Sequence, residues 1–162
     1  SCRDSLDTTD ADPVDDPDSI YAFRRLVEPW TAHSNGDADA CVVEGGVPEA
    51  LGALGLSHAR TASLSPYEAL SWLAWTAASG GAHGKRRGAA TGRGEAWWFL
   101  ATFVGLADDW PCDPAEFGEV VNSLEFTSFT YDKAPTGGWG LHLVIEDPEE
   151  GLAIALRATD VE

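Results

Sequence analysis

The sequence predicts an α+β fold in one domain, with a central antiparallel pair of helices, short helices and a C-terminal β-hairpin. Residues 66–79 and 95–106 have the apolar content of two helices. Residues 125–131 and 139–146 alternate between apolar and polar on either side of a turn that contains proline and glycine, which is typical of a hairpin. A chain of 162 residues with 44% hydrophobic content is large enough to form one domain core.

The first eighteen residues differ in composition from the rest of the chain. They contain seven Asp and two Pro and almost no apolar side chains. Such a segment buries too little apolar surface to offset the entropy lost on ordering. We therefore expect a disordered acidic tail over residues 1–18 and a globular domain over residues 19–162.

Several short elements are predicted in the first half of the domain. Apolar residues recur at helical spacing from residue 19 to Pro29, where a helix would end. The segments that follow predict a strand at 40–46, a short helix at 47–56, and a loop or an edge strand at 59–65.

The later helices carry clear start signals. Ser65 is an N-cap residue, Pro66 occupies the first helical position, and Glu68 completes a capping box. This helix would end at the glycine pair 80–81. Similar signals predict a short helix from Asp113 through residue 121 and a final helix from residue 147 over residues 151–158.

A basic segment, residues 79–95, stands out because the chain has only ten Lys and Arg against 27 Asp and Glu. Within it Gly84, Gly88, Gly92 and Ala96 recur at every fourth residue, which gives a helix one smooth face. Glycine inside a helix costs about 1 kcal/mol relative to alanine, so close approach of another backbone is the expected reason. We therefore predict a helix that begins near Gly84 and packs tightly on the helix from Pro66.

That placement would bring the positive charges together. Arg86 and Arg93 would point in nearly the same direction, with Trp97 continuing the line. His83 and Lys85 would lie at the amino end of the helix, where free N–H groups attract anions. On this basis the predicted catalytic residues are His83, Arg86 and Arg93, and the predicted substrate-binding residues are Lys85, Arg87 and Trp97.

The segment has two other interpretations. It differs from a nucleotide-binding P-loop, because Ser79 replaces the first glycine and Arg86 replaces the Ser or Thr that would hold magnesium. The cations could instead pair with the surplus of carboxylates and serve structure alone, and surface ion pairs of that kind carry little functional meaning. The anion-site and structural interpretations both stay open at this point.

The overall charge excludes several classes of function. A formal net charge of −17 argues against nucleic acids as partners and disfavours anionic membrane surfaces. The sequence lacks a stretch of about eighteen apolar residues, so it predicts no membrane-spanning helix. Three widely spaced cysteines without a Cys-x-x-Cys pair fit a reducing cytoplasm. Carboxylates gather around Trp110 and could hold Mg²⁺ or Ca²⁺, but their spacing is not that of an EF-hand loop, and we expect no metal and no cofactor.

Three segments resemble an uncharacterised actinobacterial protein family. They are GGVPEALGAL, SPYEALSWLAWTAASGGAHGKRRGAATGR and DDWPCDP. The resemblance implies a bacterial cytoplasmic protein and brings no assigned activity.

The leading functional hypothesis is a small bacterial enzyme, or one subunit of a two-chain enzyme, that acts on an anionic small molecule. Its basic segment would bind sulfate, phosphate or carboxylate and stabilise developing charge. Elimination or ring closure with an anionic leaving group in specialised metabolism would suit such a site. The alternative is a non-catalytic interaction or regulatory module whose basic segment contacts an acidic surface of a partner chain.

Overall fold

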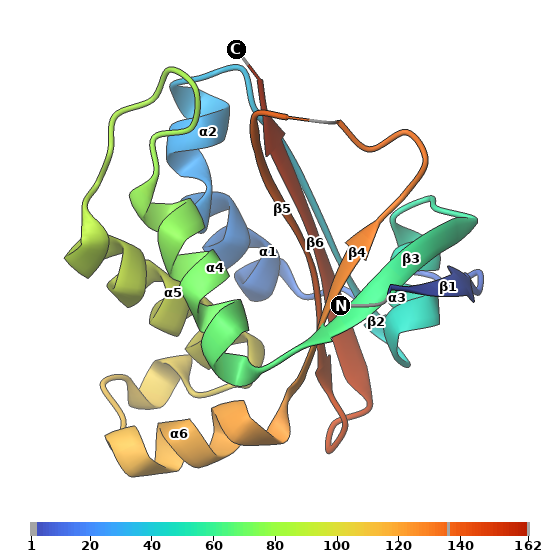
Figure 1. Ribbon diagram of the computed structural model, residues 1–162. Coiled ribbons are helices and arrows are strands. Elements are labelled where there is room, and N and C mark those ends of the chain that lie inside the picture. The colour runs from blue at the N-terminus through green and yellow to red at the C-terminus, as the bar shows by residue number, and fades with distance from the viewer. Residues whose placement is uncertain (1–2, 136, 162) are drawn as a thin grey trace.

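The computed structural model describes residues 3–135 and 137–161 and has an α+β fold, as predicted (Figure 1). Its antiparallel sheet has the strand order β1-β3-β4-β5-β6-β2. The strands are β1 (Asp4–Asp7), β2 (Asp37–Glu44), β3 (His58–Leu64), β4 (Glu125–Thr130), β5 (Trp139–Asp147) and β6 (Leu152–Asp160). The helices are α1 (Pro17–Leu26), α2 (Glu28–Ala32), α3 (Val47–Ala53), α4 (Pro66–Ala78), α5 (Ala89–Phe103), the 3₁₀ turn η1 (Ala107–Asp109) and α6 (Pro114–Ser123).

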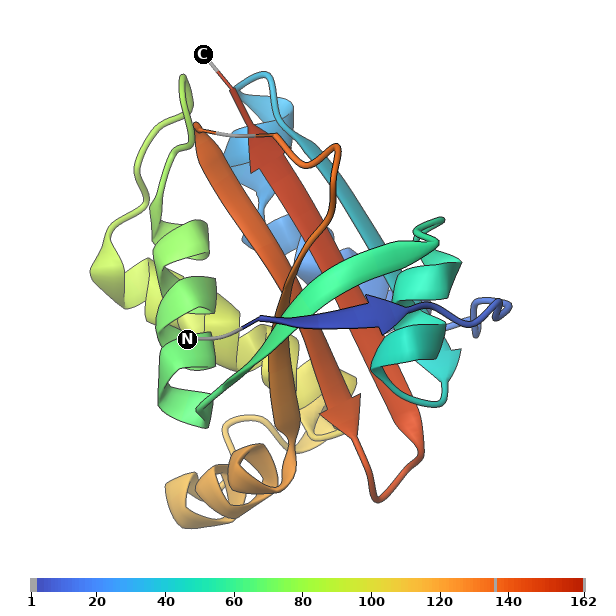
Figure 2. The same cartoon turned by 45° about the vertical axis from the view of Figure 1, so that its right-hand side comes forward.

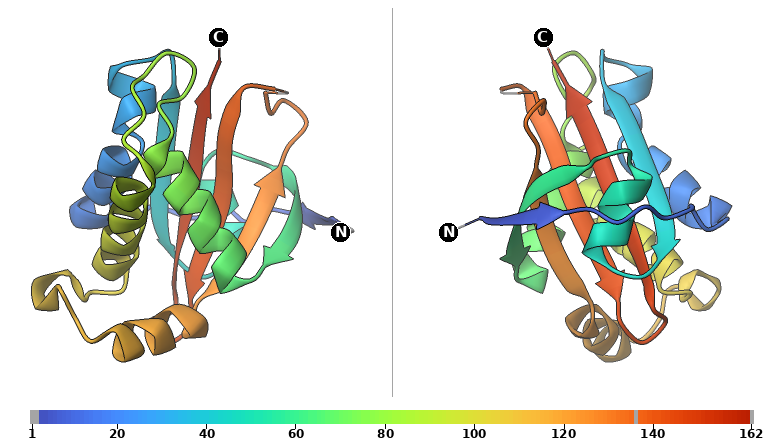
Figure 3. Two further views of the ribbon diagram at one scale, coloured as in Figure 1. Left: turned by 60° about the vertical axis from the view of Figure 1, so that its left-hand side comes forward. Right: turned by 90° about the vertical axis from the view of Figure 1, so that its right-hand side faces the viewer.

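The sheet is covered on both faces. The helices α1, α4, α5 and α6 lie on one side of it, and α3 lies on the other, where β1 also crosses (Figures 1 and 3). Side chains of β6 divide between the two cores: Ile154 and Leu156 join the helical side, whereas Ala153 and Ala155 join the α3 side. The helical side holds the larger core and includes the buried Trp30.

The predicted final helix is wrong, because the segment forms strand β6 between β5 and β2. Its central residues, from Ala153 to Leu156, are all buried. A strand buried on both faces loses the apolar–polar alternation that identifies strands in a sequence. A nearly continuous apolar run of this length is compatible with a helix or with a buried strand, and only the elements that pack against it decide between them.

The predicted hairpin is confirmed. Strands β4 and β5 pair antiparallel, with Glu125 opposite Glu146 and Ser128 opposite Leu143. Position 136 of the predicted turn lies outside the described residues. Strand β5 also pairs with β6 along its length, so the hairpin forms the centre of the sheet.

The acidic N-terminal segment differs from the expected disordered tail. Residues 4–7 form β1 and pair with β3, which makes β3 an internal strand (Figure 2). Farther along, the Val14 N–H donates to the Val42 carbonyl. Backbone pairing at an open sheet edge does not depend on apolar side chains, so composition alone does not reveal it. Residues 1–2 lie outside the described part of the chain.

The central helices α4 and α5 pack as predicted at one glycine. A side chain at Gly92 would collide with the Ala74 carbonyl and lie 2.7 Å from the Ala78 methyl group. The predicted helix start near Gly84 is wrong, because α5 begins at Ala89. Gly88 precedes it with φ of +89°, a left-handed conformation that favours glycine and interrupts the helix.

Candidate functional site

The basic segment forms a loop, residues 79–88, between α4 and α5. The loop lies next to α2 and near the carboxyl end of β6 (Figures 1 and 2). The Ala82 N–H donates to Oδ2 of Asp160 at 2.6 Å, and the His83 N–H donates to Oγ of Ser34 at 3.0 Å. Asp160 is 1% exposed, so the loop is attached to a buried carboxylate of the sheet.

Arg87 has a structural role in this loop. Its Nε donates to the Ala77 carbonyl at 2.8 Å, and its terminal nitrogens donate to the carbonyls of Arg25, at 3.2 Å, and Leu26. These carbonyls belong to the last turns of α4 and α1, where backbone oxygens lack helical partners and the dipole favours a cation. Arg87 therefore joins two helix ends.

Burial is the main influence on the pKa of Arg87. It lowers the pKa of the guanidinium, and Arg25 lowers it further, while Glu95 and Glu28 act in the opposite direction. Glu95 in turn lies 3.1 Å from Nε of Arg25. Three of the five N–H donors of Arg87 are engaged by backbone carbonyls, so this geometry favours a structural role over the predicted role in substrate binding.

Part of the predicted site does come together in one pocket. Lys85, Arg86 and Arg87 line a cavity of about 430 Å³, which we call the basic pocket. Lys85 and Arg86 are exposed there. Two further lining residues flank α2: Glu28 is its first residue, and His33 follows its last.

Glu28 and His33 were not predicted as site residues. About fifty residues separate them from the basic loop, and the sequence has no motif that connects the two segments. The close contact between the loop and α2 depends on Gly84, where a side chain would collide with the carbonyls of Pro29 and Gly80. Gly84 belongs to the glycine series that predicted a close backbone approach, but the backbone it approaches includes that of Pro29 in α2, whereas the prediction named the helix from Pro66.

Three predicted residues lie outside the basic pocket. His83 is exposed and is not part of the pocket lining. Thr91 of α5 does line it, but Arg93 is two positions later, about 200° around the helix. Because α5 begins after Arg86, the expected alignment of Arg86 with Arg93 does not occur.

Trp97 lies instead in a second cavity, of about 440 Å³, which we call the aromatic groove. Its walls come from the start of α4, from α5, from the segment 110–112 and from α6. The Trp97 and Phe117 ring centroids are 6.4 Å apart, and those of Trp110 and Phe117 are 5.7 Å apart. The groove is therefore mainly apolar.

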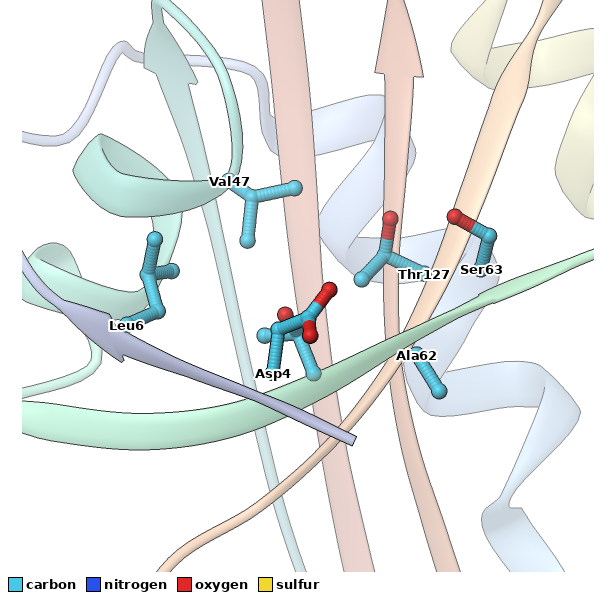
Figure 4. A pocket seen from close by; sticks show the side chains of 7 residues that line it. Asp4, Leu6, Val47, Ala62, Ser63 and Thr127 are labelled. Carbon is cyan, nitrogen blue, oxygen red and sulfur yellow. The ribbon is translucent and has the colours of Figure 1, made fainter. Parts of the chain in front are cut away.

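A third cavity, of about 410 Å³, lies on the α3 side of the sheet. Figure 4 shows Leu6 and Val47 on one side of it, Thr127 and Ser63 on the other, and Asp4 between them. Hydroxyl groups and one exposed carboxylate give this cavity no concentrated charge, and it contains none of the predicted site residues.

Other classes of site would need metal ligands or a reactive thiol. Within residues 3–135 and 137–161, no group of three or more His, Cys, Asp or Glu side chains is arranged to hold a metal ion. Cys41 and Cys112 are free thiols, and burial, followed by the charge of Asp39, raises the pKa of Cys41. No helix in the described part of the chain has the length and apolar character needed to cross a membrane.

Comparison with known proteins gives one match. Neither the curated proteins nor the solved structures include a match to this chain. A family of unknown function, DUF6183, matches residues 1–162, which is the whole sequence. The chain therefore belongs to the DUF6183 family.

Proposed function

We propose that this chain binds the anionic group of a small molecule, such as sulfate, phosphate or carboxylate, in the basic pocket. The observation that supports the proposal is the gathering of Lys85, Arg86 and the imidazole of His33 around one cavity of about 430 Å³. Two cationic side chains in one concave site favour a ligand with several anionic oxygens.

The enzyme hypothesis is retained with revised roles. Lys85 and Arg86 would bind the oxygens of the anion, while Arg87 would keep the loop in place through its carbonyl contacts. His33 replaces His83 as the candidate proton donor, because it lines the pocket. Elimination or ring closure with an anionic leaving group, by this chain or with a second subunit, is the proposed chemistry.

Glu28 gives the pocket selectivity. Its carboxylate lies in the same lining and would repel an anion that is not held by the cations. A ligand must therefore make direct contact with Lys85 and Arg86 to bind. For the same reason, the −17 charge of the chain would not by itself attract such ligands.

Thermal unfolding with sulfate, phosphate and pyrophosphate, against chloride at matched ionic strength, tests anion binding. A ligand at 100 times its Kd adds about 2.7 kcal/mol, which corresponds to a rise of roughly 5–10 °C for a domain of this size. Arg86→Ala and Lys85→Ala should abolish the rise. Arg93→Ala is the matched control, because Arg93 is exposed and outside the pocket lining.

A specific shift that disappears in Arg86→Ala but persists in Arg93→Ala would support the basic pocket. Equal shifts in chloride, or equal losses in both variants, would refute it. The alternative, an interaction module, is favoured by the exposure of Lys85 and Arg86 on a loop that can reach a partner surface. It predicts no small-anion effect and a partner chain whose binding is lost in Arg86→Ala.

A further inference from the structure

The aromatic groove has the size and lining of a small-molecule site. Its volume of about 440 Å³ lies in the range of pockets that enclose organic ligands. Its lining residues include Tyr67 and Leu70 of α4, Trp97 of α5, and Trp110 and Phe117. Tyr67 is 80% exposed and Trp97 is 46% exposed, so two large aromatic side chains remain in contact with water.

Residues of α6 leave space in the groove. Gly118 is part of its lining, and a methyl group added there would meet no atom within 4 Å. Glycine inside a helix costs about 1 kcal/mol relative to alanine. At Gly92 the close approach of α4 explains that cost, whereas no contact within the described chain explains it at Gly118. The open volume beside Gly118 is available to a ligand.

The charges beside the groove favour a cationic ligand. Asp109 immediately precedes Trp110, and Asp113 lies between the lining residues Cys112 and Pro114. Neither residue is part of the groove lining, and the Asp113 carboxylate accepts from the Ala115 N–H at 3.1 Å as the N-cap of α6. Asp109 is exposed and forms no ion pair within the described residues. The faces of Trp and Tyr rings also attract cations. The net charge of −17 acts in the same direction over longer distances.

The aromatic groove and the basic pocket are separate sites on α5. Arg93 precedes Trp97 by one helical turn, but it is not part of the groove lining. Thr91, in the basic pocket, and Trp97 are about 120° apart around α5. The two cavities thus open on different sides of the helix, and the groove does not depend on the proposed anion site.

We propose that the aromatic groove binds a small organic cation, an ammonium group attached to an aromatic or branched apolar body. The apolar body would lie against Trp97, Phe117 and Gly118, and the ammonium group would lie at the ring of Trp110, the lining residue that Asp109 precedes in the chain.

Three probes with one ring system test both parts of the proposal: 2-naphthylmethyl-trimethylammonium, 2-naphthalenemethanol and 2-naphthalenesulfonate. Binding is followed by NMR, using the indole N–H signals of Trp97 and Trp110, with backbone signals of Lys85 and Arg86 reporting the basic pocket separately. The ammonium probe should saturate the indole shifts with a Kd at least fivefold lower than the sulfonate, and the alcohol should lie between them.

Two variants, each with a matched control, locate the site. Gly118→Leu fills the groove and should raise the Kd of the ammonium probe at least tenfold. Gly94→Leu is the matched control, since Gly94 is also a helical glycine with no atom within 4 Å of an added methyl group, and it lies outside the groove lining. Asp109→Asn should reduce the preference for the ammonium probe, whereas Glu119→Gln, outside the groove lining, should not.

The outcomes are distinct. Saturable indole shifts that are lost in Gly118→Leu and kept in Gly94→Leu support the site, and if Gly118→Leu does not fold, Trp97→Ala gives the same comparison. The site is overturned if the ammonium probe does not bind, or if its binding is unaffected by Gly118→Leu or, where that variant does not fold, by Trp97→Ala. Equal or tighter binding of the sulfonate through the indole signals overturns the assignment of a cationic ligand. Shifts confined to Lys85 and Arg86 would support the basic pocket and count against the groove.

Discussion

His142 provides a prediction about acid stability. It lies on β5 on the α3 side of the sheet, with its ring centroid 5.3 Å from that of Phe129 and 5.7 Å from that of Tyr131. Its Nε2 is buried and has no hydrogen-bond partner within the described structure. Burial, together with the charges of Arg157 and Arg3, lowers the pKa of His142 from 6.5 to about 4.

The sign of the effect follows from proton binding. The unfolded chain protonates His142 below pH 6.5, but the folded chain resists protonation until about pH 4. Stability that is present above pH 6.5 is therefore lost as the pH falls through this interval. A difference of about 2.5 in pKa corresponds to about 3 kcal/mol over the whole interval and about 2 kcal/mol between pH 7.5 and 5.0. The imidazole is partly exposed, and solvent screening reduces the latter value to about 1 kcal/mol.

His142→Phe and His142→Leu remove the titrating group while retaining an apolar side chain. Urea unfolding at pH 7.5 and 5.0 should show that each variant loses about 1 kcal/mol less stability than the wild type over this range. The two variants differ in packing, so a shared change in pH dependence isolates the imidazole. His33→Gln, which removes an exposed histidine, is the control. Parallel losses in the wild type and both His142 variants would refute this account.

Three further predictions concern local packing and are tested by urea unfolding. Arg87→Ala should lower the free energy of unfolding by about 2–4 kcal/mol, because carbonyls at two helix ends lose their donor. Arg87→Lys should not restore the stability, since one ammonium group does not reproduce the planar guanidinium. A loss below about 0.5 kcal/mol in Arg87→Ala would contradict the structural role. Gly92→Ala should destabilise the protein by about 1–3 kcal/mol through overpacking against α4, whereas Gly94→Ala should stabilise it by up to about 1 kcal/mol. Equal effects of the two substitutions on the free energy of unfolding would argue against the close helix contact. Ser65→Ala should cost about 1 kcal/mol by removing the cap that accepts from the Glu68 N–H at 3.1 Å, and an unchanged stability would show that the cap contributes nothing.

Local signals in the sequence predicted several elements well. The capping box of Ser65 and Glu68 marked the start of α4, and the Asp113 cap marked the start of α6. Alternation marked the hairpin of β4 and β5. Each of these features depends on contacts between residues that are close in the chain, so propensity and spacing are sufficient to identify them.

The candidate site was predicted only in part, and the reason is geometric. The glycine spacing indicated the close contact at Gly92 but extended the helix too far toward the amino end. Arg87 binds carbonyls of distant segments, which a local charge pattern does not reveal. His33 entered the basic pocket, and Trp97 joined the aromatic groove, through packing of elements that are far apart in the sequence.

The sequence by itself determined the α+β class, the central helix pair, the hairpin and the concentration of cations between residues 83 and 93. The tertiary structure decided that residues 152–160 form a strand, that residues 4–7 join the sheet, and which cations share a pocket. The difference has one physical cause. Caps, turns and periodicity depend on neighbours in the chain, whereas burial on both faces of a sheet and convergence of side chains on a cavity depend on partners that only the folded chain brings together.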